Sequence, residues 1–219
     1  TQVNYHQEKS KLEALTNLTE RYEGYGGSVK KVMECKEKEK GILGVVADII
    51  KVDKKYETAI ETALGGNIQN IVTDDEETAK RMIAFLKQTR SGRATFLPLT
   101  SITNPQEFKN PDSLKEKGVI GMADALVSTD QKYKNVAKAM LGRIVVVDNV
   151  DNAVKIARKY DYGIRMVTLE GELLVPGGAI SGGAFKNNSN LLGRRREMEE
   201  LEGNVKKFLK EIDVLLNEI

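Results

Sequence analysis

The chain has 219 residues, of which 40% are hydrophobic and 30% charged, and its formal net charge is only +2. This near balance excludes strong long-range attraction to nucleic acid, so any binding of phosphates has to come from local basic patches. Cys35 is the single cysteine and His6 the single histidine, so the chain can form no internal disulfide and has almost no ligands for a zinc site or a histidine-based catalytic pair. No apolar run approaches the roughly 20 residues of a membrane-spanning helix, and no signal peptide is visible. We expect a cytoplasmic protein without a membrane partner.

The two ends of the chain carry heptad patterns, in which the candidate core positions are separated by three and four residues in alternation. The N-terminal pattern consists of Tyr5, Glu8, Leu12, Leu15, Thr19 and Tyr22. The stronger C-terminal pattern consists of Met198, Leu201, Val205, Phe208, Ile212, Leu215 and Ile219, with Leu209 and Leu216 widening the apolar face. Such helices need a partner along their length. We therefore predict that the ends pair as an antiparallel coiled coil, with an ordinary helical bundle as the alternative for the N-terminal helix.

The chain between these helices contains an internal repeat. Gly44–Gly65 aligns without a gap on Gly121–Gly142, and the identical pairs are Gly44 and Gly121, Asp53 and Asp130, Lys55 and Lys132, Tyr56 and Tyr133, Leu64 and Leu141, and Gly65 and Gly142. In each copy a short strand-like run precedes a helix, which ends at a glycine. We predict two copies of one structural unit, each with a left-handed glycine cap at the end of its helix.

Each copy continues with a β-branched run that predicts a buried strand, Ile68–Thr73 in the first copy and Ile144–Asp148 in the second. A helix with an acidic start follows each strand, most clearly at residues 74–77. Clustered carboxylates can bind a divalent metal, but capping and the helix dipole also favour acidic residues at a helix N-terminus. We expect helix caps here and no metal.

The two copies end differently. The first has a short strand, Arg93–Pro98, whose proline indicates the edge of a sheet. The second has strand-like runs at Arg165–Leu169 and Glu172–Val175, separated by a turn at Glu170 and Gly171.

A glycine-rich stretch follows the last of these strands. It consists of Pro176, Gly177, Gly178, Ala179, Ile180, Ser181, Gly182 and Gly183. The sequence contains no Walker A string, and a dinucleotide-binding loop would need a helix with an apolar face after the glycines, which residues 185–190 do not offer. Strand glycines also let a second backbone approach closely. We therefore predict an edge strand that joins a sheet of another subunit through main-chain hydrogen bonds, with Ala94–Pro98 as the receiving strand; a flexible hairpin end is the alternative.

Two basic stretches lie where the terminal helices meet the central part of the chain. Residues 186–196 contain Lys186, Arg194, Arg195 and Arg196 without an acidic residue, and residues 30–40 contain Lys30 and Lys31 among mixed charges. Clustered basic side chains bind phosphates by releasing counterions, without reading sequence. Weak DNA contact is one hypothesis for both stretches, and a solvated charged surface is the other.

Three segments in this order resemble the hinge domain of SMC (structural maintenance of chromosomes) proteins, and most of all the bacterial homodimeric SMC. They are GILGVVADIIKVDKKYETAIETALGGNIQNIV (Gly41–Val72), GRATFLPL (Gly92–Leu99) and GELLVPGGAISGG (Gly171–Gly183). The resemblance covers nearly all of the chain between the two heptad patterns, which flank it as the coiled-coil arms flank the hinge in that family.

The resemblance implies a mixed α/β (α+β) fold of two similar subdomains, from which two coiled-coil arms leave. It implies a homodimer whose contacts are made by the glycine-rich stretch, Gly177–Gly183, and weak, sequence-independent DNA contact. It also implies a nucleoid-associated, non-enzymatic role without a small-molecule substrate. ATP is expected only at head domains that lie outside this chain, so no cofactor is expected here.

These observations suggest four segments along the chain. We expect an N-terminal arm at 1–25, a first subdomain at 26–117, a second at 118–193 and a C-terminal arm at 194–219. One alternative of a different class stays open, namely a small α/β ligand-binding domain or enzyme whose Gly177–Gly183 loop grips an anionic ligand.

Overall fold

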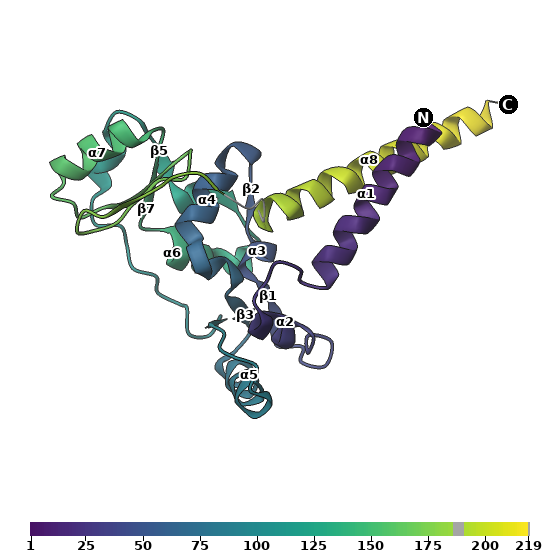
Figure 1. Cartoon of the computed structure of the whole chain (residues 1–219), viewed down its shortest axis with the longest axis horizontal. Helices are drawn as coiled ribbons and strands as arrows, with labels where there is room; N and C mark the ends of the chain where they lie inside the picture. Colours follow the sequence, from purple (N-terminus) through teal and green to yellow (C-terminus); the bar gives the residue numbers. More distant parts are fainter. Residues whose placement is uncertain (186–190, 219) are drawn as a thin grey trace.

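The structure is a computed structural model, and it describes residues 1–185 and 191–218 (Figure 1). Two long helices, α1 (Gln2–Glu20) and α8 (Leu191–Asn217), leave the same side of the central body and run side by side. Both chain ends lie at the far tip of this pair, so the helices are antiparallel. The predicted pairing of the two ends is therefore confirmed.

The heptad positions form the contact between the two helices. In α1 the half-buried residues include Tyr5, Glu8, Leu12, Leu15 and Thr19, and in α8 they include Met198, Leu201, Val205, Phe208 and Ile212. The hydroxyl of Thr19 contacts the sulfur of Met198 at 3.0 Å. The expected widening of the apolar face is wrong, because Leu209 and Leu216 are 42% and 62% exposed. Leu215 is also exposed, since the register set by Thr19 and Met198 puts it opposite the first residues of α1. Ile219 lies outside the described residues.

The central body consists of short helices and strands that recur in the two halves of the chain. The first half contains α2 (Gly27–Met33), β1 (Ile42–Val45), α3 (Val46–Ile49), β2 (Lys51–Val52), α4 (Glu57–Leu64), β3 (Ile71–Thr73), α5 (Glu76–Thr89) and β4 (Phe96–Pro98). The second half contains β5 (Val119–Met122), β6 (Val127–Ser128), α6 (Lys134–Leu141), β7 (Ile144–Val147), α7 (Val150–Lys159), β8 (Arg165–Thr168), β9 (Leu173–Leu174) and β10 (Ile180–Ser181). Short 3₁₀ turns connect several of these elements.

The sheets display the repeat directly. The first sheet has the order β1-β3-β4 and the second the order β10-β9-β8-β7-β5. In both, an antiparallel pair (β1 with β3, β5 with β7) is extended by a parallel strand (β4, β8). β2 and β6 pair across the two halves, and Lys51 faces Ser128, its equivalent in the repeat alignment. The axis that relates the copies therefore passes between these two residues. The predicted fold class is confirmed, and β9 and β10 are additions in the second copy.

Side-chain caps start the helices after β3 and β7, but only the first of these caps is acidic as predicted. The Asp75 carboxylate accepts a hydrogen bond from the Thr78 N–H at 2.8 Å, at the start of α5. The Asn149 side chain accepts one from the Asn152 N–H at 2.9 Å, at the start of α7. Both side chains satisfy an N–H group that the first turn of a helix leaves free.

The predicted glycine caps differ between the copies. Gly65 ends α4 with a φ of +53° but a ψ of −133°, outside the left-handed helical region, and Gly142 ends α6 with a right-handed φ of −71°, so the predicted left-handed helical cap is wrong in both copies. A Cβ at Gly142 would lie 2.4 Å from the carbonyl oxygen of Lys138, which is why this position holds glycine. The predicted first strand is also shorter than expected, because Gly65–Gln69 forms a 3₁₀ turn before β3.

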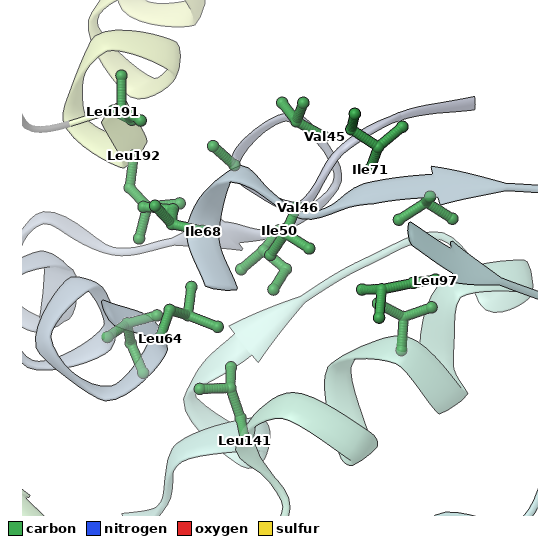
Figure 2. Close-up of a cluster of buried hydrophobic side chains, with 14 of the residues drawn as sticks. Val45, Val46, Ile50, Leu64, Ile68, Ile71, Leu97, Leu141, Leu191 and Leu192 are labelled. Carbon is green, nitrogen blue, oxygen red and sulfur yellow. The ribbon is translucent and has the colours of Figure 1, made fainter. Parts of the chain in front are cut away.

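One hydrophobic core joins both halves and the start of α8 (Figure 2). Val46, Leu64 and Ile71 of the first half lie in one cluster with Leu141 of α6 and with Leu192 of α8. On β7 the residues alternate between this cluster and a second one, which includes Ala153 and Ile156 of α7. The five-stranded sheet therefore has α7 on one face and the shared core on the other.

Gly118→Ala tests the close approach that the repeat requires at the start of each copy. Gly118 has a φ of +91°, and a Cβ there would lie 2.5 Å from a carboxylate oxygen of Asp148. We expect a loss of about 2 kcal/mol in the free energy of unfolding, measured by urea denaturation. Gly203→Ala is the matched control: Gly203 lies within α8 with nothing within 4 Å of an added Cβ, so it should gain about 1 kcal/mol. Equal stability of the two variants would contradict the packing described here.

Candidate functional site

The glycine-rich stretch forms a hairpin between β9 and β10. The carbonyl of Val175 accepts a hydrogen bond from the Gly178 N–H at 3.1 Å, which closes a four-residue turn. Pro176 occupies the second position, and Gly177 occupies the third with a φ of +100°. A type II turn requires this combination, because a side chain at the third position would be strained. The glycines therefore shape a tight turn that presents β10.

β10 is the edge of the five-stranded sheet. It pairs with β9 through Ile180 opposite Leu174 and Ser181 opposite Leu173. The Ala179 carbonyl accepts a hydrogen bond from the Val175 N–H at 3.0 Å. Because successive residues of a strand direct their backbone groups to opposite sides, Ile180 and Gly182 direct theirs away from the sheet. Residues 176–185 are all exposed, and Ile180 is 54% exposed. The predicted edge strand is thus present.

β4 is the matching edge of the three-stranded sheet. The Thr95 carbonyl accepts a hydrogen bond from the Ile71 N–H, and the Leu99 N–H donates one to the Thr73 carbonyl, both at 2.9 Å. The alternation therefore directs the backbone groups of Phe96 and Pro98 away from β3. In the second copy the equivalent strand, β8, is covered by β9 on this side. The first sheet lacks such a covering strand within the described chain.

The glycines do not form a cradle for a metabolite in the described part of the chain. An added Cβ at Gly177 or Gly183 would have nothing within 4 Å. The cavity that touches Gly178 holds about 20 Å³, whereas small-molecule sites commonly hold about 300 to 1,000 Å³. The geometry favours a strand that offers its backbone outward over a loop that encloses a ligand.

The three arginines after residue 193 lie at the root of α8, where each has an intramolecular partner. Arg196 forms an ion pair with Glu57, which is only 3% exposed at the start of α4, and with Glu200 at 2.9 Å. Arg195 lies 3.9 Å from Asp48 of α3. Arg194 donates a hydrogen bond to the backbone carbonyl of Glu23 at 2.6 Å, beyond the end of α1.

The two basic stretches partly converge on Glu23. Its carboxylate lies 3.5 Å from the ammonium group of Lys30, while its carbonyl accepts from Arg194. Lys31 is exposed, and Lys186 lies outside the described residues. Of the sequence-predicted basic residues that the structure describes, Lys30, Arg195 and Arg196 form ion pairs, Arg194 donates to a backbone carbonyl, and Lys31 is exposed.

Three carboxylates at the root were missed by the sequence analysis. Asp48 and Glu57 pair with arginines of α8, and the carboxylate of Glu61 accepts a hydrogen bond from the Leu192 N–H at 3.1 Å. Glu57 and Glu61 are one turn apart in α4, which is the only sequence signal that they share. Nothing in the sequence indicated that α8 begins above them.

Burial sets the electrostatics of this root. Burial raises the pKa of the Asp48 carboxyl above its ordinary value, although the neighbouring Arg195 acts in the opposite direction. Burial also raises the pKa of Glu61, although the N–H groups of Leu192 and Leu191 favour the ionised form. The start of α8 therefore lies on carboxylates that are partly removed from water.

Among the residues described, no helix has the length and apolar content that crossing a bilayer demands.

Glu61→Gln tests the buried cap of α8. Because the pKa of Glu61 is raised above 4.5 in the folded state, protonation favours folding, and the free energy of unfolding of the wild type should rise relative to this variant as the pH falls from 7 towards 4.5. Urea denaturation at several pH values measures the difference. Glu61→Ala, which removes the acceptor, should lose about 1 kcal/mol at pH 7.

Glu116→Gln is the control with the opposite sign. Lys159 lowers the pKa of the half-buried Glu116, so the wild type should lose its advantage over this variant as the pH falls. The same direction of change in both variants would contradict the assignment of a buried Glu61.

Comparison with known proteins agrees with this architecture. The family model described as "SMC proteins Flexible Hinge Domain" matches residues 39–157. The chromosome partition protein Smc of Halothermothrix orenii is 40% identical over 210 residues, which are 95% of this chain and 18% of that protein. The Smc of Bacillus subtilis is 39% identical over 199 residues, which are 89% of this chain and 17% of that protein. The chain thus spans less than a fifth of the length of these curated relatives.

Solved structures give the same result. An asymmetric dimer of the Geobacillus stearothermophilus SMC hinge domain has a TM-score of 0.88 and 34% identity, over 97% of this chain and 86% of that chain. A Pyrococcus furiosus Smc hinge domain with an extended coiled coil has a TM-score of 0.57 and 32% identity, over 99% of this chain and 87% of that chain. With a family model that matches more than half of its residues, the chain belongs to the SMC hinge domain family.

Proposed function

We propose that this chain is a homodimerisation hinge, in which β10 of each protomer pairs with β4 of its partner. The observation that carries the proposal is that β10 and β4, each an edge strand of its sheet, direct backbone groups away from that sheet, one in each half of the chain. Two open edges in one protein invite pairing with another chain. A solved relative, the Geobacillus stearothermophilus SMC hinge domain, is described as an asymmetric dimer, which supports dimerisation here, whereas the strand pairing rests on the two edges alone.

The two edges are complementary in their hydrogen-bonding groups. Ile180 and Gly182 offer N–H and C=O groups on β10, whereas β4 offers both groups of Phe96 but only the carbonyl of Pro98. Pairing through backbone groups would also explain why Gly178 and Gly182 lie two residues to either side of Ile180, since side chains there would keep the second backbone at a distance. In a two-fold dimer each edge is used twice, so the assembly closes without growing into a fibre.

The proposed dimer joins four arm helices in one object. We propose the arms at 1–25 and 194–219 and the subdomains at 26–117 and 118–193, with the interface at Gly177–Gly183. The curated relatives are chromosome partition proteins, so we propose a nucleoid-associated, non-enzymatic role in chromosome organisation. ATP would act only at head domains beyond the arms.

We also propose weak, sequence-independent DNA contact at the arm root. The exposed Lys31 at this root supports it. Lys30, Arg195 and Arg196 are engaged with carboxylates, so we assign them a smaller share of this contact. Such binding would come from counterion release and weaken with salt.

Ile180→Pro tests the dimer edge. Proline removes the outward N–H of β10 but leaves the bonds of Ala179 and Ser181 to β9, and edge strands tolerate proline. We expect a dimer for the wild type and a folded monomer for the variant in sedimentation equilibrium, with unchanged circular dichroism. Ile180→Thr, which keeps the N–H group, should remain dimeric. A dimeric Ile180→Pro, or a wild type that is monomeric at high concentration, would disprove the proposed edge.

Lys31→Glu tests the DNA contact. Binding of a duplex should weaken, and the slope of log K against log[salt] should become shallower by about 0.9 for each lost phosphate contact. Lys80→Glu, at an exposed position of α5, makes the same change in net charge far along the chain and should leave binding unchanged. Equal effects of the two variants would mean that only net charge matters.

A further inference from the structure

A second region of positive charge lies in the second half of the chain, away from the arm root. It surrounds a cavity of about 370 Å³ between residues 108–110, the end of α6, the starts of β7 and β8, and Pro176. Three basic residues line this cavity, namely Lys109, Arg143 and Arg165, and no acidic residue does. The cavity has the size of a small-molecule site, since such sites begin at about 300 Å³.

The basic side chains of this cavity are not neutralised within the described chain. None of the three takes part in an ion pair among the described residues, and Arg143 donates a hydrogen bond to the neutral Gln106 at 2.7 Å. The contrast with the arm root is clear, because Arg195 and Arg196 both have carboxylate partners there. Like charges gathered in one cavity repel one another, and a bound anion would relieve that repulsion.

The repeat indicates that the fold does not require these charges. The strand pairing makes Val145 the counterpart of Ile71, and Met166 the counterpart of Phe96. Arg143 therefore corresponds to Gln69, and Arg165 corresponds to Thr95. The first copy thus builds the same strands with a glutamine and a threonine at these positions. The arginines are additions that the strand pairing itself does not explain.

The other walls of the cavity restrict the chemistry of the ligand. Phe108, Met140 and Ile164 contribute apolar surface beside the basic side chains. Arginine binds phosphate through two parallel hydrogen bonds, and an aromatic ring can stack on a flat group. We propose that this cavity binds a phosphate ester that carries a flat aromatic group. A mononucleotide, either free or within a nucleic-acid strand, is such an ester.

The test compares three probes on the full chain by isothermal titration calorimetry: dAMP, deoxyadenosine and inorganic phosphate. We expect dAMP to bind, and deoxyadenosine to bind at least about tenfold more weakly, because it lacks the charged group. Arg165→Thr, which introduces the residue of the first copy, should weaken dAMP binding about tenfold. Arg158→Thr is the matched control, since Arg158 is exposed on α7 and does not line the cavity.

A dephosphorylated single-stranded oligonucleotide separates the two sources of phosphate. If the strand binds and Arg165→Thr weakens this binding, the proposal is supported with nucleic acid as the ligand. If dAMP binds and the strand does not, the proposal is supported with a free nucleotide as the ligand. The proposal is overturned if dAMP does not bind at millimolar concentration, or if Arg165→Thr and Arg158→Thr bind it equally. It is also overturned if Arg165→Thr abolishes the dimer in sedimentation while dAMP binding persists, because the basic residues would then serve a second copy of the chain.

Discussion

The contact on which the arrangement of this hinge depends is the burial of Glu57 beneath Arg196. A carboxylate that is only 3% exposed is costly unless it is paired, and Arg196 of α8 is one of its partners. The carboxylate of Glu61, one turn further along α4, accepts the N–H of Leu192 at the first turn of the same helix. The C-terminal arm therefore begins on the first half of the chain, although it follows the second half in sequence.

This anchoring brings both arms to one place. Leu191 and Leu192 of α8 enter the core that also contains Leu141 of the second half (Figure 2). Tyr22 and Tyr25, after α1, pack against this core. The open edges β4 and β10 lie on the two sheets built around that core. Arms and sheet edges are thus connected through continuous packing. Because a close-packed interior has low compressibility, it transmits strain between the arms and the sheet edges.

The repeat accounts for the unequal halves. Both copies make the same antiparallel pair, the same parallel extension and the same capped helix. Only the second continues into β9 and β10, so it covers β8 and exposes a new edge, while β4 in the first remains uncovered. An added edge strand in one copy and an uncovered edge strand in the other provide the two complementary surfaces that association of identical chains needs. Divergence at Arg143 and Arg165 then adds charge to the second copy alone.

The sequence by itself determined the elements whose signal is local: the heptads of α1 and α8, the repeat, the capped helices, the edge position of Pro98 and the glycine-rich edge strand. Periodicity, proline and glycine act through their own backbone, so neighbouring residues suffice to predict them. Only the tertiary structure decided which charges are neutralised. Arg196 meets Glu57 across 139 positions of sequence, whereas Arg165 meets no carboxylate in the described chain. Ion pairing depends on distance in space, and no local pattern in the chain records it.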